Sequence, residues 1–212
     1  MKTSIVFFGT PDFAKESLSR LYDDPKVNIK GVVSGPDRQS GRGLKTKQSE
    51  VAAFAVEREI SLSQPSDLES DDFIKVLKEW NAEIFVVVAF RKLPKNVWSI
   101  PKLGTFNIHA SLLPAYRGAA PIQWAIANGE TLTGVTSFFI NDVIDSGDMI
   151  LQLKVKIGTN EGISSLYDKL KIAGASLALD TIFAISSEKT TRIEQKMDGV
   201  DKKAPKIFTQ FG

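Results

Sequence analysis

Two short apolar runs constrain the fold of this chain more than any other feature of its sequence. The first, residues 4–8, ends at Gly9, and the second, residues 83–89, is the most apolar strand that the sequence predicts. Continuous apolar runs are typical of strands that are covered on both faces, as in parallel sheets. We therefore predict an α/β fold, in which residues 83–89 form a central strand and helices lie on both faces of a mostly parallel sheet.

The periods of apolar residues place the other predicted elements around these two runs. Pro11 suits the first position of a helix that follows Gly9, with Thr10 as its cap. Alternation predicts an antiparallel pair of strands near the C-terminal end, and an apolar stripe predicts a long helix after that pair. The predicted strands include residues 27–34, 134–140 and 149–157, and the predicted helices include residues 50–59, 71–80, 117–129 and 163–185.

Composition excludes several classes of protein. The 212 residues suit one domain, and a net charge of +2 is too small to indicate a nucleic-acid partner by itself. The absence of cysteine excludes disulfides and thiolate catalysis, and a single histidine disfavours a zinc site, so we expect no metal. No stretch reaches the roughly 20 apolar residues of a membrane helix, and the first apolar run is too short for a signal peptide. We expect a cytoplasmic protein with no membrane partner.

Two segments share part of the composition of phosphate-binding loops. Pro11 and Ala14 stand where a dinucleotide-binding fingerprint that starts at Gly9 has glycines, so the sequence disfavours a nicotinamide cofactor. Residues 35–47 combine three glycines with four cations, which are Arg38, Arg42, Lys45 and Lys47. A flexible arm that grips phosphates has this composition. An ordinary solvated loop has it too, and composition alone favours the solvated loop.

Residues 104–118 hold the only histidine of the chain. Apolar and polar residues alternate there, which predicts a strand with Asn107 and His109 on the same face. An amide and an imidazole on one face can both donate to a single oxygen atom, as a tetrahedral oxyanion requires. A nearby Asp145 would orient the imidazole, favour its charged form or hold a water that moves protons. The alternatives are a half-buried strand with a wet polar side and, for residues 145–148, a plain turn.

Taken together with further motifs, these residues resemble the methionyl-tRNA formyltransferase family. The matching motifs are residues 9–14, 36–38, 41–43, Asn107-x-His109, 111–114, 117–123 and 145–148, and the resemblance extends to about residue 207. It implies a Rossmann-like formyltransferase fold. It also implies an enzyme of translation initiation that transfers a formyl group from 10-formyltetrahydrofolate to the α-amine of methionine on initiator tRNA.

The resemblance also implies roles for individual residues. Catalysis is expected from Asn107, His109 and Asp145. Folate is expected against Ser111, Leu112, Leu113 and Pro114, and against Ala89, Phe90 and Ile140. The acceptor stem of the tRNA is expected at Arg38, Arg42 and Lys45. The chain departs from the usual family pattern at Phe90-Arg91, where relatives carry tyrosine and glycine, and at Val143, where they carry glycine; both departures bear on the folate wall and the nearby loop.

The same resemblance implies a division of the chain. Residues 1–187 are expected to form the formyltransferase catalytic domain, and residues 188–212 a polar tail that begins a linker. In the family this linker leads to a C-terminal domain of OB type, which we expect to be absent from this chain. We expect a monomer whose partners are folate and initiator methionyl-tRNA.

Four other functions compete with this expectation. Glycinamide ribonucleotide formyltransferase and the sugar-nucleotide N-formyltransferases belong to the same superfamily as the methionyl-tRNA enzymes. Residues 9–13 and the basic loop with Arg38 and Arg42 argue against glycinamide ribonucleotide formyltransferase, which binds its small phosphate ester with a glycine-rich backbone. A non-catalytic RNA-binding module and a dehydrogenase are the alternatives from other classes.

Overall fold

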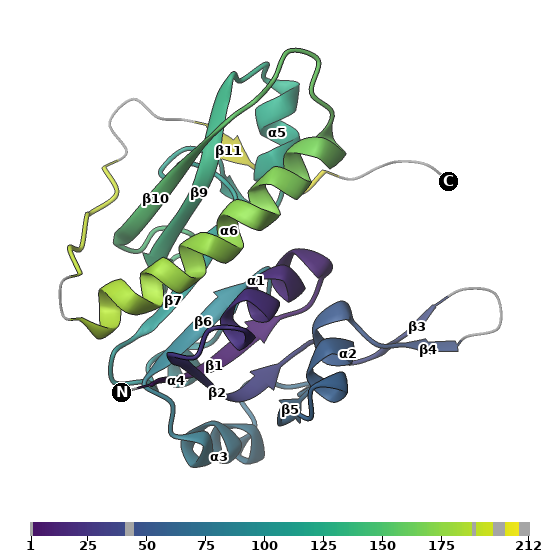
Figure 1. The fold of residues 1–212 in the computed structure, drawn as a ribbon, viewed down its shortest axis with the longest axis vertical. Helices are drawn as coiled ribbons and strands as arrows, with labels where there is room; N and C mark the ends of the chain where they lie inside the picture. The colour runs from purple at the N-terminus through teal and green to yellow at the C-terminus, as the bar shows by residue number, and fades with distance from the viewer. Residues whose placement is uncertain (1, 41–44, 188–189, 197–201, 208–212) are drawn as a thin grey trace.

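A computed structural model describes residues 2–40, 45–187, 190–196 and 202–207 of the chain. Within these residues a sheet of seven strands has the order β10-β9-β7-β6-β1-β2-β5 (Figure 1). These strands are β1 (Thr3–Gly9), β2 (Val27–Val33), β5 (Leu62–Ser63), β6 (Ile84–Val88), β7 (Thr105–His109), β9 (Leu132–Phe139) and β10 (Met149–Lys156).

The sheet is mostly parallel, as predicted. Strands β7, β6, β1, β2 and β5 run in the same direction, while β9 is antiparallel to β7 and β10 is antiparallel to β9. The predicted central strand is confirmed, since β6 has three strands of the sheet on either side. All five residues of β6 are buried, because helices cover both of its faces.

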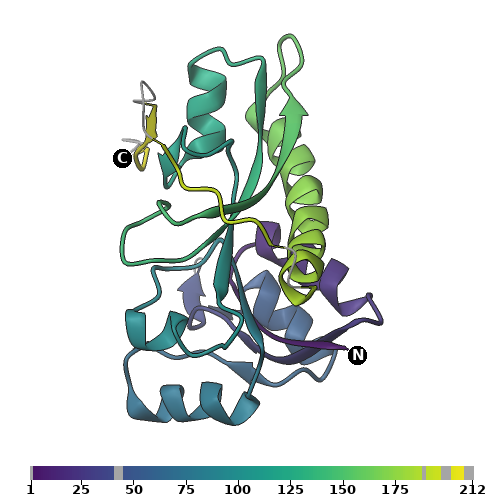
Figure 2. The ribbon, with the colours of Figure 1, turned by 90° about the vertical axis from the view of Figure 1, so that its left-hand side faces the viewer.

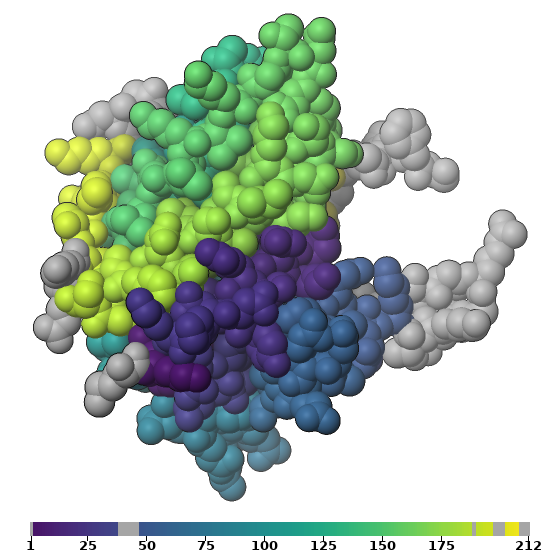
Figure 3. Space-filling model, viewed as in Figure 1, coloured from purple at the N-terminus to yellow at the C-terminus, as the bar shows by residue number. Residues whose placement is uncertain are grey.

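The alternation of side chains along each strand divides the core into two clusters. Ile5 and Phe7 of β1 belong to one cluster, and Val6 and Phe8 belong to the other. Helices α1 (Asp12–Tyr22), α2 (Glu50–Glu57) and α6 (Ile163–Ser186) cover the first face, where α6 lies against α1 (Figures 1 and 3). Helices α3 (Asp71–Trp80) and α4 (Lys95–Trp98) lie on the other face (Figure 2).

This alternation decides where the polar residues of β7 point. Phe106 and Ile108 pack in the cluster under α1 and α6. Asn107 and His109 therefore point to the opposite face of the sheet. Helix α5 (Pro121–Ala127) follows β7 after a turn. On the face to which Asn107 and His109 point, beyond the end of β7, the structure has a cavity, and no residue of α3 or α4 is among the described residues that line it.

Some local predictions are wrong. Helix α1 has Pro11 rather than Thr10 at its N-cap, with no side-chain cap; the Thr10 hydroxyl instead accepts a hydrogen bond from Gly35 N, which ties the end of β1 to the end of β2. The helix predicted in residues 117–129, with Pro121 near its start and Gly129 past its end, is α5. The first two residues of that segment instead form β8 (Arg117–Gly118), which pairs in parallel with β11 (Lys203–Ala204).

The predicted C-terminal tail is described only in part. Residues 190–196 run from the end of α6 beside β10, where Ile193 pairs with Met149, and residues 202–207 include β11. These stretches pack on the domain that precedes them through backbone hydrogen bonds such as Tyr116 N to Lys202 O, 2.6 Å long. The predicted division after residue 187 stays a prediction.

Candidate active site

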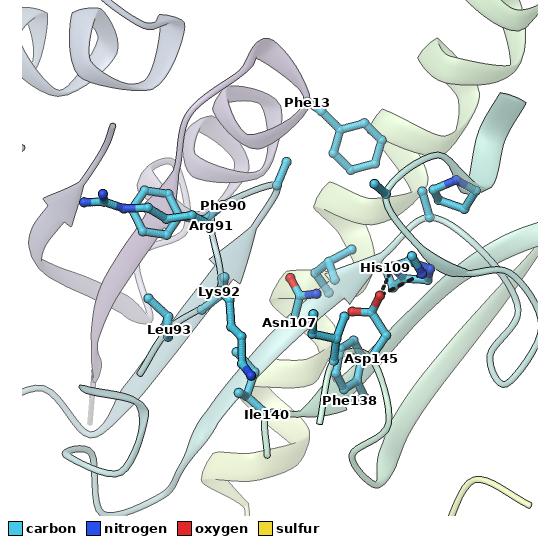
Figure 4. Close-up of a pocket in the computed structure, with 18 of the residues that line it drawn as sticks. Phe13, Phe90, Arg91, Lys92, Leu93, Asn107, His109, Phe138, Ile140 and Asp145 are labelled. Atoms are coloured by element: carbon cyan, nitrogen blue, oxygen red, sulfur yellow. Dashed lines mark hydrogen bonds and ion pairs between the residues drawn. The ribbon is translucent and has the colours of Figure 1, made fainter. Parts of the chain in front are cut away.

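A cavity of about 590 Å³ opens beyond the carboxyl ends of β6 and β7. Ligands of open α/β sheets bind at this edge, and cavities of this size hold cofactors and drug-sized molecules. The walls come from the exit of β6, from β7, from the loop between β9 and β10 and from the start of α5. Figure 4 shows Asn107, His109 and Asp145 together at one side of it.

The Asn107 side chain reaches the cavity from the middle of the sheet. It is half-buried, and its strand places it between Val87 of β6 and Phe138 of β9. Among the residues that the structure describes, none forms a hydrogen bond with its amide. The amide is therefore free to donate to a ligand atom in the cavity.

The orientation of His109 is set by a backbone carbonyl. The ring is buried, and its Nε2 lies 2.8 Å from the carbonyl oxygen of Tyr116. A carbonyl oxygen only accepts, so Nε2 carries a proton in this contact. Tyr116 holds a left-handed backbone conformation with φ +61°, which turns its carbonyl toward the ring. The other ring nitrogen, Nδ1, faces Asp145.

Asp145 lies close enough to the ring to act through its charge. Its Oδ2 is 3.8 Å from His109 Nδ1, within the range of an ion pair but too long for a direct hydrogen bond. The same oxygen accepts a hydrogen bond of 3.0 Å from Gly118 N. The Tyr116 carbonyl orients the ring in this structure, and the three roles predicted for the Asp145 carboxylate stay predictions.

The loop that carries Asp145 adopts an unusual backbone conformation. Asp145 has φ +52°, which L residues rarely adopt. A Cβ on Gly147 would meet Phe139 O at 1.7 Å, so the loop approaches β9 more closely than any other residue would allow. Burial lowers the pKa of the Arg117 guanidinium behind this loop, and the carboxylate of Asp145 opposes that shift.

The residues predicted to contact folate fall into two groups. Ala89, Phe90 and Ile140 line the cavity. The stretch 111–114 is not among the described lining residues, and its hydrogen bonds shape the turn after β7 instead: Ser111 Oγ donates to Ala115 O at 2.6 Å, and Leu113 N donates to Thr136 Oγ1 at 3.1 Å. Contact between this stretch and folate stays a prediction.

The departure at Arg91 has a structural role. The Arg91 guanidinium donates to the carbonyl oxygens of Ser66, at 2.8 Å, and Pro65. Its charged end therefore points away from Asn107 and His109, as Figure 4 shows, while Phe90 packs edge-on against Phe8. Val143, the second departure, is 64% exposed at the cavity rim.

An ion-pair network closes the side of the cavity near α1 and α6. Phe13 and Tyr167 line the cavity, and the Tyr167 hydroxyl donates to Asp12, which also pairs with Lys171. Burial, followed by the hydrogen bond to Asp12, raises the pKa of Tyr167, so this group is a neutral donor. Burial alone would raise the pKa of Asp12, but the hydrogen bonds from Tyr167 and Lys171 outweigh it and hold that pKa below its usual value.

The residues predicted to contact tRNA lie on a separate hairpin. Arg38 is in β3 (Arg38–Ser40) and Lys45 is in β4 (Lys45–Lys47), and the two strands pair antiparallel. Arg42 lies outside the described residues. Within the part of the chain that is described, no three histidine, aspartate or glutamate side chains gather as a metal site would need, and no helix combines the length and apolarity of a membrane span.

Sequence reasoning missed the groups that hold His109 and Asp145 in place. The Tyr116 carbonyl and the Gly118 amide are backbone atoms, so residue type does not reveal their roles. Gly118 was part of a recognised motif, and its conformation explains the glycine: φ is +126°, and a Cβ there would meet Ala204 O at 2.4 Å. Gln195, from the predicted tail, also contacts the Asp145 loop.

Comparison with known proteins identifies a family and relatives that are similar to this chain in sequence. The family model described as formyl transferase matches residues 1–182. A methionyl-tRNA formyltransferase of Bacteroides thetaiotaomicron is 46% identical over 209 residues, 97% of this chain and 65% of that protein. One from Flavobacterium psychrophilum is 50% identical over 182 residues, 86% of this chain and 58% of that protein. This chain thus spans less than two thirds of the length of either relative.

Solved structures with low sequence identity share the fold. Glycinamide ribonucleotide transformylase 1 from Symbiobacterium toebii superposes with a TM-score of 0.76 at 15% identity, over 91% of this chain and 95% of that one. A sugar 3N-formyl transferase, solved in the presence of dTDP and 5-N-formyl-THF, gives a TM-score of 0.71 at 22% identity, over 97% of this chain and 70% of that one. These structures confirm the predicted fold class.

Proposed function

We propose that this chain, which belongs to the formyl transferase family, carries the catalytic site of an enzyme that transfers a formyl group from 10-formyltetrahydrofolate to the α-amine of methionine on initiator tRNA. The observation that carries this proposal is the meeting of Asn107, His109 and Asp145 at one cavity, from a strand and a loop far apart in the sequence. The names of the relatives support the choice of acceptor.

The cavity suits a folate donor by its size and by the chemistry of its walls. Phe90, Leu93 and Ile140 form an apolar side that would bury a flat ring system, and the free amide of Asn107 lies across from them (Figure 4). When bound, the donor would supply a formyl carbon that is already activated for attack. Contact of the donor with Ser111, Leu112, Leu113 and Pro114 stays part of the proposal.

Asn107 and His109 are proposed to stabilise the charge that develops on the formyl oxygen. The Asn107 amide donates one hydrogen bond, and a protonated Nδ1 of His109 donates a second, since its Nε2 proton is already held by Tyr116. Preorganised donors of this kind are each worth about 3–4 kcal/mol when charge builds up in a dry site. Asp145 stabilises the charged ring at a distance of 3.8 Å.

The bond changes require a proton to move. A bond forms from the acceptor nitrogen to the formyl carbon, the bond from that carbon to the donor nitrogen breaks, the acceptor amine loses a proton and the donor nitrogen gains one. His109 and Asp145 are the groups placed to exchange these protons, directly or through a water. Help of this kind is worth about 10²–10⁴-fold in rate.

The β3–β4 hairpin is proposed as a contact for the tRNA. Its strands extend away from the sheet (Figure 1), and the segment carries Arg38, Arg42 and Lys45, whose charges suit phosphates. The proposal places the enzyme in the cytoplasm as a monomer.

One set of assays separates this function from its alternatives. The chain is incubated with 10-formyltetrahydrofolate and, in turn, with methionyl initiator tRNA, glycinamide ribonucleotide and an amino-sugar nucleotide. We expect formylation of the methionyl-tRNA and none of the other two acceptors. Transfer to either small acceptor alone would assign the chain to that enzyme class. A His109→Ala variant that folds and keeps the full rate would remove His109 from the mechanism.

A further inference from the structure

A glutamine from the C-terminal part of the chain joins three parts of the proposed active site. Gln195 is 8% exposed, and its Nε2 donates to the carbonyl oxygens of Asp145, at 3.0 Å, and Gly147, at 2.7 Å. Its Oε1 accepts from Nε and Nη2 of Arg117, at 3.0 and 2.6 Å. Both N–H groups and both acceptor positions of this amide are therefore used.

Backbone pairing brings Gln195 to this position. Ile193 and Met149 exchange two backbone hydrogen bonds, of 2.8 and 3.0 Å, at the start of β10. Since the pairing is antiparallel, it places Gln195 opposite Gly147, two residues away on each side. Figure 2 shows the segment crossing from the end of α6 toward β11, which is itself paired with β8. The pairing of Ile193 with Met149 thus sets the register of Gln195.

The loop that Gln195 holds needs support from outside itself. The left-handed conformation of Asp145 persists only where surrounding contacts determine it. Gly118 N fixes the end of the Asp145 side chain, and Gln195 fixes the backbone from which that side chain starts. Through Arg117, the residue next to Gly118, the same amide also ties the loop to β8.

We propose that Gln195 is a positioning residue, which holds the Asp145 carboxylate at its distance from Nδ1 of His109. This inference rests on the proposed function and deepens it. Gln195 lies beyond residue 182, where the match to the family model ends.

A double-mutant cycle, in which kcat and KM are measured for each variant, tests the proposal. Gln195→Ala and Asp145→Asn are made singly and together, with Glu194→Gln, an exposed neighbour, as the control. We expect Gln195→Ala to lower kcat by about 10²-fold, as misplacement of a catalytic group does. The KM for the donor stays within about twofold, since Gln195 is not among the described cavity residues. In the Asp145→Asn background the same change costs less than about threefold, because the charge that it positions is already gone.

A second readout does not depend on turnover. The chain has one histidine, so ring ¹⁵N labelling gives one pair of nitrogen signals, from His109. We expect Gln195→Ala to shift the Nδ1 signal at constant pH and Glu194→Gln to leave it in place. If the unchanged chain formylates no acceptor, the proposed function fails, and the spectrum still tests the contact between Gln195 and the site.

Two results would overturn the proposal. One is an unchanged Nδ1 signal together with a kcat within about threefold of the parent in Gln195→Ala. The other is a loss that is equally large with and without the Asp145 carboxylate, which would indicate general disorder of the fold. Should Gln195→Ala not fold, Gln195→Met, which keeps the length of the side chain and lacks the amide, takes its place with the same expected results.

Discussion

Replacing Asp145 by asparagine isolates the charge of the carboxylate from its structural contact. Asparagine has nearly the same shape, and its oxygen can still accept the hydrogen bond that Gly118 N donates over 3.0 Å. The negative charge 3.8 Å from His109 Nδ1 is lost. Two unit charges at this separation interact by about 4 kcal/mol at an effective dielectric constant of about 20, which corresponds to about 10³-fold in rate.

The expected loss is somewhat smaller than this figure. The side chain of Asp145 is 13% exposed, so water and salt screen part of the interaction. We therefore expect Asp145→Asn to lower kcat by about 10²–10³-fold, with the thermal midpoint changed by only a few degrees. Initial rates of formyl transfer to methionyl initiator tRNA, at saturating donor, measure the first quantity, and a thermal melt measures the second.

Asp142→Asn is the matched control for this experiment. Asp142 lies in the same loop, is exposed, and has its carboxylate 3.9 Å from Lys95 Nζ rather than near the ring. It should keep the full rate. If Asp145→Asn also keeps its rate within about threefold while its melt is unchanged, the carboxylate does not act on His109 through charge and the reasoning above is wrong.

Two further predictions concern stability. Gly118→Ala places a Cβ 2.4 Å from Ala204 O at φ +126°, whereas the Cβ of Gly129→Ala meets nothing within 4 Å. Gly118→Ala should therefore lower the free energy of unfolding by about 1–3 kcal/mol more than Gly129→Ala. Denaturant titration compares the two variants, and equal losses would contradict the predicted clash. Hydrogen bonds, first from Gly158 N, lower the pKa of Glu161 from 4.5 to about 2. The stability that Glu161 gives is therefore present above pH 4.5 and lost as the pH falls toward 2. Glu161→Gln should destabilise the fold at pH 7 and not near pH 2. A difference in the free energy of unfolding between parent and variant that stays constant across this range would contradict the assignment.

Residue type and period were sufficient to predict the centre of the fold and the face of β7 from which Asn107 and His109 point. The five apolar residues of β6 can be buried on both sides only in the middle of the sheet. Residues two apart on a strand point to the same face, so the alternation predicts that Asn107 and His109 share a face of β7 without knowledge of the neighbouring strands. The approach of Asp145 to His109 came from the family resemblance, since no local pattern encodes a contact across 36 positions.

The groups that fix the site geometry, and one contact outside the site, could not be predicted, for three different reasons. Tyr116 acts through its backbone carbonyl, and it adopts a left-handed conformation that a glycine in the sequence would usually indicate. Outside the site, Thr10 has the residue type of a helix cap, but its hydroxyl accepts a hydrogen bond from Gly35 N, two residues after the end of β2. Gln195 sits among polar residues with no period, and only backbone pairing of Ile193 with Met149 brings it to the loop.

The place of β1 between β2 and β6 has a consequence for synthesis on the ribosome. Its pairing with β2 needs residues up to Val33, but its other edge pairs with β6 and stays open until Val88 has been made. During that interval β1, apolar on both sides, offers an unpaired edge, which is the feature that invites misassembly between nascent chains. Codon changes that slow translation between these two strands should therefore increase aggregation more than equal delays placed after β6.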